Sequence, residues 1–266
     1  MSRLTFVGLG LHSELGITLE GVEEAKRADR VFAEFYTSYM PSLSIPNLET
    51  LIGKRIEILT RKDVEESAEA RILSHARKQA CVFLTPGDPN VATTHIDLRI
   101  RAEKTGIKTS VIHAASISSA IAGATGLQSY KFGRTVTIPF ALASGSEVPY
   151  ENICENRLRS LHTLTLLDID AEDKKYMTIP EALTQLTEIE QRKRKECVTL
   201  NTLAVGVARL GSPQTKVRAD AVRSLRECDW GGAPHCLVFL GKLHFMEAEA
   251  LEILCGARRE LLEGHT

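Results

Sequence analysis

The sequence lacks the patterns that mark several classes of protein. Its 33 basic and 34 acidic residues leave a formal charge of −1, and no long run of one sign is present to follow a phosphate backbone. The first residues, Met1–Gly8, hold only a few apolar side chains, fewer than a signal sequence or a membrane span requires. We therefore expect a soluble, cytoplasmic protein that binds neither nucleic acid nor membranes.

Paired cysteines, low-complexity linkers and internal repeats are lacking as well. No two cysteines stand in a C-x-x-C pair, so neither a zinc site nor a small disulfide framework is indicated. We expect buried thiols and no metal. The six cysteines are Cys81, Cys154, Cys197, Cys228, Cys236 and Cys255.

What the chain does contain is room for two compact domains, because it has 266 residues, 43% of them hydrophobic. In its first half, short β-branched and apolar runs alternate with stretches of helical period, which predicts a parallel sheet covered by helices. After the first strand we expect a helix that Thr18 can cap. The other predicted elements are strands at 4–7, 30–35, 56–60, 81–85 and 108–113, and helices at 64–78 and 95–104.

The second half has a different order of predicted elements. Two strands follow one another without a helix after Leu210, which indicates a mixed sheet. A segment rich in Ala, Ser and Gly at 113–129 marks the junction, and we expect an N-terminal domain over 1–113 and a C-terminal domain over 114–266. The predicted strands are 135–139, 163–168, 203–208, 216–221 and 236–240, and the predicted helices lie near 150–161, 179–193 and 245–254.

Residues that directly follow the strands are the candidates for a site, because ligands of doubly wound sheets bind beyond the carboxyl ends of the strands. Gly8-Leu9-Gly10 follows the first strand and resembles part of a dinucleotide fingerprint, although Ser13 stands at the third glycine position. A simple tight turn explains the two glycines as well. Glu34 lies where a ribose-binding acid is expected, so a nicotinamide-dependent oxidoreductase stays an alternative.

Thr85–His95 is the segment with the strongest chemical signal. Pro86 and Gly87 suit the centre of a type II turn, and Asp88 precedes a proline that keeps it out of the helical region. This sequence predicts either a rigid loop that presents one carboxylate at the sheet edge or an ordinary turn before a helix.

Other strand ends carry weaker signals. Small residues and hydroxyls at 113–120 suit either a ligand at a helix start or a cap by Ser116. In the second half, Leu167, Leu210 and His235 lie at strand ends or starts, although each alone is more typical of a core or structural residue.

Taken together, several motifs resemble the diphthine synthases, a branch of the tetrapyrrole-methylase family. The resemblance covers essentially the whole chain. Two positions depart from the family pattern: Gly16 stands where an acidic residue precedes the first helix, and Leu200-Asn201 where acidic residues are usual. The motifs are Phe6–Leu11, Phe32–Ser38, Thr85–His95, Gly126–Gly133, Leu161–Leu164, Leu167–Ile169 and Gly241–His244.

The resemblance implies a fold and an activity. The fold is two α/β domains, with a parallel N-terminal sheet and a mixed C-terminal sheet, and with S-adenosyl-L-methionine in the cleft between them, in a homodimer. The activity is three methyl transfers to the amino group of the 3-amino-3-carboxypropyl-histidine of translation elongation factor 2, which give diphthine and S-adenosyl-L-homocysteine. The donor contacts that it implies are Leu11, Asp88, Val91, Ser116, Ile117, Leu167, Leu210 and His235.

The resemblance does not identify a general base. Asp88, Tyr130 and His244 are candidates, and solvent is another. We expect Tyr36, Thr37, Ser38, Tyr130 and Lys131 at the rim where the protein substrate enters. Two further alternatives stay open: a small-molecule methyltransferase of the same fold, and a non-enzymatic module that binds the translation machinery.

Overall fold

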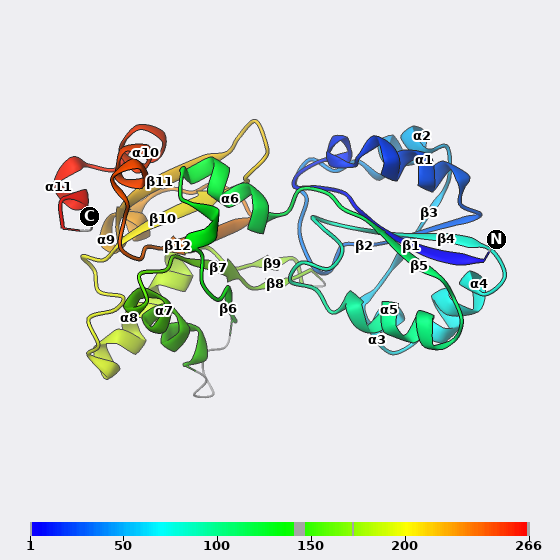
Figure 1. The fold of residues 1–266 in the computed structure, drawn as a ribbon, viewed down its shortest axis with the longest axis horizontal. Coiled ribbons are helices and arrows are strands. Elements are labelled where there is room, and N and C mark those ends of the chain that lie inside the picture. The colour runs from blue at the N-terminus through cyan, green and yellow to red at the C-terminus, as the bar shows by residue number, and fades with distance from the viewer. Residues whose placement is uncertain (1, 141–146, 172, 265–266) are drawn as a thin grey trace. The chain divides into compact units, whose positions relative to one another are not determined.

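The computed structural model describes residues 2–140, 147–171 and 173–264, which form two compact α/β units (Figure 1). The first unit comprises the chain up to Ile117 together with Ala171–Lys174. The second comprises Ser118–Asp170 and the chain from Lys175 onward. The predicted pair of α/β domains is confirmed.

The first unit is built on a five-stranded sheet in the order β3-β2-β4-β1-β5, with every pair of neighbours parallel. The central strands β1 and β4 are buried along nearly their whole length, as expected for strands covered on both faces. The predicted parallel sheet is confirmed. Its strands are β1 (Arg3–Gly8), β2 (Arg30–Glu34), β3 (Ile56–Leu59), β4 (Ala80–Thr85) and β5 (Thr109–Ile112).

Helices cover both faces of this sheet (Figure 1). On one face, α1 (Leu19–Arg27) and α2 (Ile45–Ile52) enclose a core with Val7 and Leu84. On the other, a core that includes Phe6 and Phe83 lies against α3, α4 and α5. The helices of this second face are α3 (Arg61–Glu65), a π-helical turn (Glu69–Leu73), α4 (Ser74–Ala76) and α5 (His95–Lys104).

Two local predictions met different outcomes. The cap of the first helix is confirmed, since the Thr18 side chain accepts a hydrogen bond from the Gly21 N–H. The single helix predicted over 64–78 is wrong. A capping box of Thr60 and Asp63 starts α3 earlier, and the carbonyl of Ser67 accepts from two N–H groups that begin a separate turn.

The strand order of the first unit defines a switch point. From β1 the chain crosses by α1 to one face, whereas from β4 it crosses by α5 to the other face. Because β1 and β4 are neighbours, their connections diverge, and in open α/β sheets the ligand crevice usually lies at the carboxyl ends of such strands. The loops after Gly8 and Thr85 lie there.

The second unit is built on a mixed sheet in the order β11-β10-β12-β7-β6, which confirms the predicted sheet type. β10 pairs antiparallel with both β11 and β12, and β6 and β7 pair parallel. The strands are β6 (Val136–Ile138), β7 (Thr163–Leu167), β10 (Leu203–Ala208), β11 (Lys216–Ala221) and β12 (His235–Phe239).

Its largest core lies between this sheet and three helices, and Tyr150, Leu183 and Trp230 are buried in it. Gly126 lies so near α10 that a Cβ placed on it would come 2.3 Å from the Ala250 Cβ.

The sequence did not predict the β8–β9 hairpin, α9 or α11, and in the first unit it did not predict α2. The remaining elements are α6 (Ile117–Thr125), α7 (Val148–Leu158), β8 (Ile169–Asp170), β9 (Lys175–Tyr176), α8 (Ile179–Lys193), α9 (Val222–Glu227), α10 (Phe245–Cys255) and α11 (Arg259–Leu262), with 3-10 turns at Glu14–Gly16 and Ser129–Lys131.

Candidate functional site

At the switch point of the first unit, the loops after β1 and β4 are joined by hydrogen bonds between backbone groups of two glycines. Gly10 and Gly87 exchange two hydrogen bonds, of 3.2 and 2.7 Å between nitrogen and oxygen, and both have positive φ angles of 77° and 67°. A Cβ on Gly8 would lie 2.5 Å from the Gly87 oxygen and 2.7 Å from the Ala114 Cβ. Three loops therefore meet here, and glycine lets them approach.

Asp88 joins the second and third of these loops. Its Oδ2 accepts a hydrogen bond from His113 Nδ1 at 2.7 Å and one from the Ala114 N–H at 3.3 Å. Its Oδ1 accepts from the Asn90 N–H at 3.4 Å. The carboxylate is nearly buried, whereas the His113 side chain is 75% exposed. The predicted rigid loop with one carboxylate at the sheet edge is present.

Glu34 lies inside the first unit rather than in the crevice. Its carboxylate is fully buried and accepts hydrogen bonds from the Tyr36 N–H, the Thr37 N–H and the Thr37 hydroxyl at 3.0, 3.0 and 2.5 Å. Burial raises the pKa of Glu34 to about 7, against the effect of these hydrogen bonds. Because the carboxylate is fully buried and both oxygens accept hydrogen bonds from the chain, Glu34 does not face a ribose as the nicotinamide alternative requires.

His95 connects Glu34 to the Asp88 loop. Its Nδ1 donates to the Pro89 carbonyl at 3.2 Å, and its Nε2 lies 3.5 Å from both the Tyr36 hydroxyl and Glu34 Oε1. Burial lowers the pKa of His95 to about 4, so the ring is uncharged at neutral pH. The Thr93 hydroxyl also donates to the Pro89 carbonyl, at 2.8 Å.

The position of Tyr36 corrects the prediction of a rim residue. Its ring is only 8% exposed and packs edge-on against His95 at 6.2 Å between centroids. The reason is Glu34, whose carboxylate draws the backbone of the following turn inward through the two N–H groups. Thr37 is held by the same carboxylate, through its own hydroxyl.

The other residues implied to contact the donor in the first unit lie close by. Leu11 directly follows Gly10, and the Val91 N–H closes a turn on the Asp88 carbonyl at 3.2 Å. Ser116 is buried, with its Cβ 4.0 Å from where a Cβ on Gly87 would be, and Ile117 begins α6. All of them are on the loops that leave β1, β4 and β5 at their carboxyl ends.

In the second unit, the implied contacts gather at one edge of the mixed sheet. Ala208 at the end of β10 pairs with His235 at the start of β12, and Leu166 of β7 pairs with Cys236. Leu167, His235 and the region of Leu210 are therefore neighbours at that edge. The structure brings together the residues of each set within their own unit.

His235 carries a buried acceptor that the chain leaves open. Its Nε2 donates to the Gly232 carbonyl at 3.0 Å, while its Nδ1 is buried and has no hydrogen-bond partner among the described residues. Burial lowers the pKa of His235, which favours the neutral ring with a lone pair on Nδ1. A buried acceptor without a partner is costly unless a ligand supplies a donor.

Comparison with known proteins decides the family. A family model described as Tetrapyrrole (Corrin/Porphyrin) Methylases matches residues 3–226. The diphthine synthase of Methanocella arvoryzae is 46% identical over 96% of this chain and 99% of its own length. That of Methanocaldococcus jannaschii is 45% identical over 95% and 98%. The chain belongs to the diphthine synthase family.

The fold of the family agrees with this assignment. A solved structure titled "Crystal structure of diphthine synthase" superposes with a TM-score of 0.90 at 40% identity, covering 98% of this chain and 99% of that chain. In the first unit, segments on which the resemblance was based form the Asp88 loop and the Glu34–His95 cluster. Those of the second unit meet around a residue that the sequence did not reveal.

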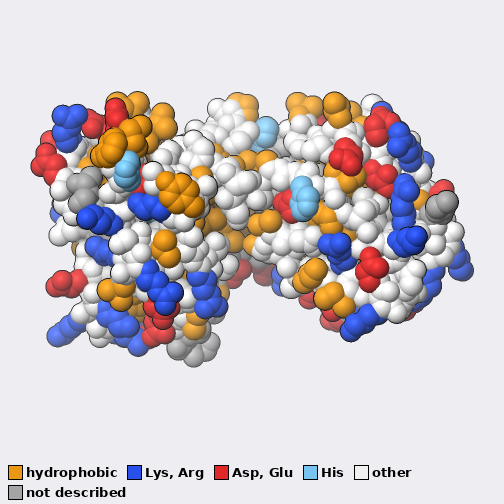
Figure 2. Space-filling model, in the orientation of Figure 1, with side chains coloured by type: hydrophobic (Ala, Val, Ile, Leu, Met, Phe, Trp, Pro, Cys, Tyr) orange, Lys and Arg blue, Asp and Glu red, His pale blue; other side chains and the backbone are white. Residues whose placement is uncertain are grey.

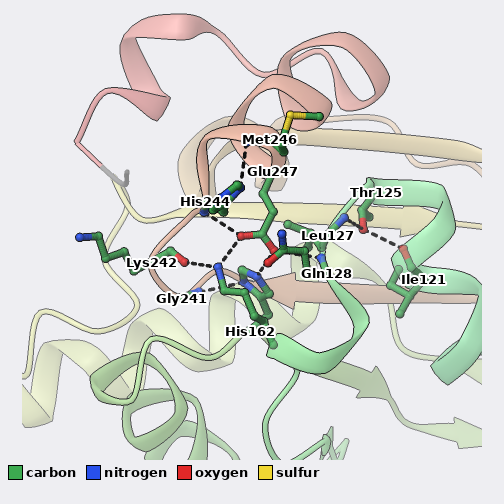
Figure 3. Close-up of polar contacts among 11 residues, drawn as sticks. Ile121, Thr125, Leu127, Gln128, His162, Gly241, Lys242, His244, Met246 and Glu247 are labelled. Carbon is green, nitrogen blue, oxygen red and sulfur yellow. Dashed lines mark hydrogen bonds and ion pairs between the residues drawn. The ribbon is translucent and has the colours of Figure 1, made fainter.

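That residue is Glu247, which is fully buried near the start of α10 (Figure 3). Its carboxylate accepts hydrogen bonds from the Gln128 N–H at 2.9 Å, His162 Nε2 at 3.0 Å and the His244 N–H at 2.8 Å, and it pairs with Lys131. Three of the segments on which the resemblance was based, at 126–133, 161–164 and 241–244, thus converge on one carboxylate. A glutamate on a helix gives no sequence signal for such burial.

This cluster also decides two of the predicted functional roles. His244 Nδ1 accepts a hydrogen bond from the Met246 N–H at 3.3 Å, so this histidine caps α10. The Lys131 ammonium is bound to Glu247 and to the Lys242 carbonyl, so it is held against its own unit. Tyr130 is 78% exposed, and its place at the rim stays a prediction.

Replacing His95 should loosen the Asp88 loop. We expect His95→Leu to lower the free energy of unfolding by about 1–3 kcal/mol, because the Pro89 carbonyl loses one of its two side-chain donors and the Tyr36 hydroxyl loses a buried polar neighbour. Hydrogen exchange at residues 87–91 should quicken at the same time. His95→Asn is the matched control, since its amide nitrogen takes the place of Nδ1 and should restore slow exchange. Equal exchange rates in both variants would contradict an anchoring role for His95.

Glu247 should make the free energy of unfolding depend on pH in the acid range. Burial alone would raise the pKa of Glu247, but the His244 N–H, Lys131, Gln128 and His162 outweigh burial and lower it to about 2. The stabilisation is therefore complete above the ordinary value of 4.5 and is lost as the pH falls from there towards 2.

Urea unfolding between pH 7 and pH 3 measures this dependence. Glu247→Gln should cost about 3 kcal/mol at pH 7, because a buried ion pair is broken, and should flatten the fall in stability below pH 5. Glu249→Gln, on the exposed side of the same helix, is the control and should change the stability by less than about 0.5 kcal/mol. A Glu247→Gln profile parallel to that of the unchanged protein would refute the assignment.

Proposed function

We propose that this protein is an S-adenosylmethionine-dependent methyltransferase, a diphthine synthase of diphthamide biosynthesis. Its substrate is the amino group of the 3-amino-3-carboxypropyl-histidine of translation elongation factor 2, which receives three methyl groups. The observation that carries the proposal is the match with curated diphthine synthases along nearly their whole length, at 45–48% identity. The glycine loops and Asp88 at the switch point provide the matching local geometry.

The residues that the resemblance implies as donor contacts are proposed to hold the donor. Backbone groups of the loops after β1, β4 and β5 suit the polar parts of the donor, and His235 Nδ1 offers a buried acceptor to one of its N–H or O–H groups. The apolar side chains complete the contact. The set is Leu11, Asp88, Val91, Ser116, Ile117, Leu167, Leu210 and His235.

Within this set, the role of Asp88 is to hold the loops in place. Its oxygens already accept hydrogen bonds from His113, Ala114 and Asn90, so its contribution to donor binding comes through the shape of the backbone that it fixes. S-adenosylmethionine supplies an activated methyl group on its sulfonium. The protein provides position and exclusion of water, the main needs of a displacement that removes a positive charge from sulfur.

The surface supports recognition by shape more than by charge. Lys and Arg side chains are interspersed with Asp and Glu over the face in view (Figure 2), and the formal charge is −1. An elongation factor is therefore not steered by a field of one sign. Within the described ranges, no helix is long and apolar enough to cross a membrane, and no group of His, Cys, Asp and Glu could hold a metal ion.

A labelling experiment tests the function. The protein is incubated with methyl-labelled S-adenosylmethionine and elongation factor 2 that bears the aminocarboxypropyl group. We expect label on the modified histidine, and none on factor that lacks the group or on a free tetrapyrrole. Label on both forms of the factor, or on the tetrapyrrole, would overturn the substrate assignment. Failure to bind S-adenosylhomocysteine in a calorimeter would overturn the methyltransferase assignment.

We also propose that the protein is cytoplasmic and forms a homodimer. α10 exposes Phe245, Met246, Ile253 and Leu254, and a patch of this kind is typical of protein–protein contacts (Figure 2). Light scattering at micromolar concentration should give twice the mass of one chain. A mass of one chain would contradict the dimer.

A further inference from the structure

We propose that His113 is the general base that takes the proton from the incoming amino group. The proposal rests on the proposed function and deepens it, because it names the group that prepares the nucleophile. Its basis is a pair of side chains, Asp88 and His113, on the neighbouring loops after β4 and β5.

The hydrogen bond between the two side chains fixes the state of the imidazole. An ionised carboxylate only accepts hydrogen bonds, so the 2.7 Å contact places a proton on His113 Nδ1. In the neutral ring, Nε2 then carries a lone pair. The His113 side chain is 75% exposed, so Nε2 can be reached by a substrate. A carboxylate that orients a histidine in this way also stabilises the imidazolium when it forms.

Asp88 is itself held rigidly, which makes the orientation of His113 defined. The Ala114 N–H donates to the same oxygen that His113 contacts, and the Asn90 N–H donates to the other. The ionisable side chain that contacts His113 is thus Asp88, on the loop after β4; on its own segment, the neighbouring Ala114 and Ala115 carry no charge. Ser116 and Ile117, proposed donor contacts, follow within four residues.

The reaction needs such a base three times. An aliphatic amine is protonated at neutral pH and has no lone pair to form a bond with carbon. Before each transfer one N–H proton moves to His113 Nε2, and the freed pair forms the N–C bond while the C–S pair stays on sulfur. His113 passes the proton to solvent through its exposed edge. Three protons leave as three methyl groups arrive, and the product is a trimethylammonium.

The candidates suggested by the sequence fit this role less well. Both oxygens of Asp88 already accept hydrogen bonds, and His244 uses Nδ1 to cap α10. Tyr130 is exposed, but its neutral phenol is a much weaker base than an imidazole. His113 combines an exposed ring, a usable lone pair and a carboxylate partner.

The test compares the unchanged protein with His113→Asn, which keeps a side-chain donor for Asp88 but has no basic nitrogen. Label transfer to elongation factor 2 should fall about a hundred- to ten-thousand-fold at pH 7, the usual effect of a general base. The deficit should shrink as the pH rises and the amine loses its proton without help. Imidazole in the buffer should partly restore transfer by His113→Ala. The affinity for S-adenosylhomocysteine should change less than threefold in His113→Asn, because this variant keeps a side-chain donor for Asp88.

A second measurement does not depend on activity. In nitrogen NMR of the full-length protein, the neutral His113 ring should show its proton on Nδ1, whereas free imidazole side chains favour Nε2. A proton on Nε2 would overturn the proposal, as would unchanged transfer by His113→Asn or a loss that is the same at every pH. If the unchanged protein does not label the elongation factor, the proposed function is wrong, and the role of His113 with it. If the unchanged protein and the His113→Asn variant label it equally, only the role of His113 as a base is wrong.

Discussion

The carboxylate of Asp88 is the point on which the rest of the site depends. It is fixed because Pro89 restricts the preceding backbone and because three donors from two loops converge on its oxygens. Through these bonds the loop after β4 is tied to the loop after β5, while Gly87 ties it to the loop after β1. Loops are usually the mobile part of an α/β protein, so this bonding provides the preorganisation that methyl transfer needs.

Each unit also holds a buried carboxylate that gathers segments of its own unit. Glu34 gathers the turn at Tyr36 and Thr37 and faces His95, which in turn holds Pro89. Glu247 gathers segments that are more than a hundred residues apart in the chain. Burying a charge is expensive unless every oxygen is satisfied, and both sites supply at least three donors.

The two carboxylates reach different states because their partners differ. Glu247 has the ammonium of Lys131 beside it, and its pKa falls to about 2 despite burial. Glu34 has hydrogen-bond donors, and its histidine neighbour, His95, is uncharged. Among the described residues no cation is in direct contact with Glu34, and burial raises its pKa to about 7. Glu34 therefore lies near its titration point under physiological conditions, whereas Glu247 stays ionised.

The sequence by itself determined the elements that local chemistry specifies. Apolar runs marked the strands of both sheets, Thr18 marked its helix, and the Pro86-Gly87-Asp88-Pro89 segment marked the rigid loop at the sheet edge. These signals are short-range, since they arise from periodicity, capping and the restricted backbone of proline and glycine. The motif resemblance extended them to the family.

Only the tertiary structure decided which side chains meet. Glu34 looked like a ribose ligand and Tyr36 like a rim residue, yet both are buried together with His95, 59 positions from Tyr36. Glu247 gave no signal, and His113 gained its carboxylate partner only when strands β4 and β5 placed their ends on the same side of the sheet. Where a polar side chain points, and whether it is buried, depends on partners far away in the sequence. Local propensity contains no information about those partners.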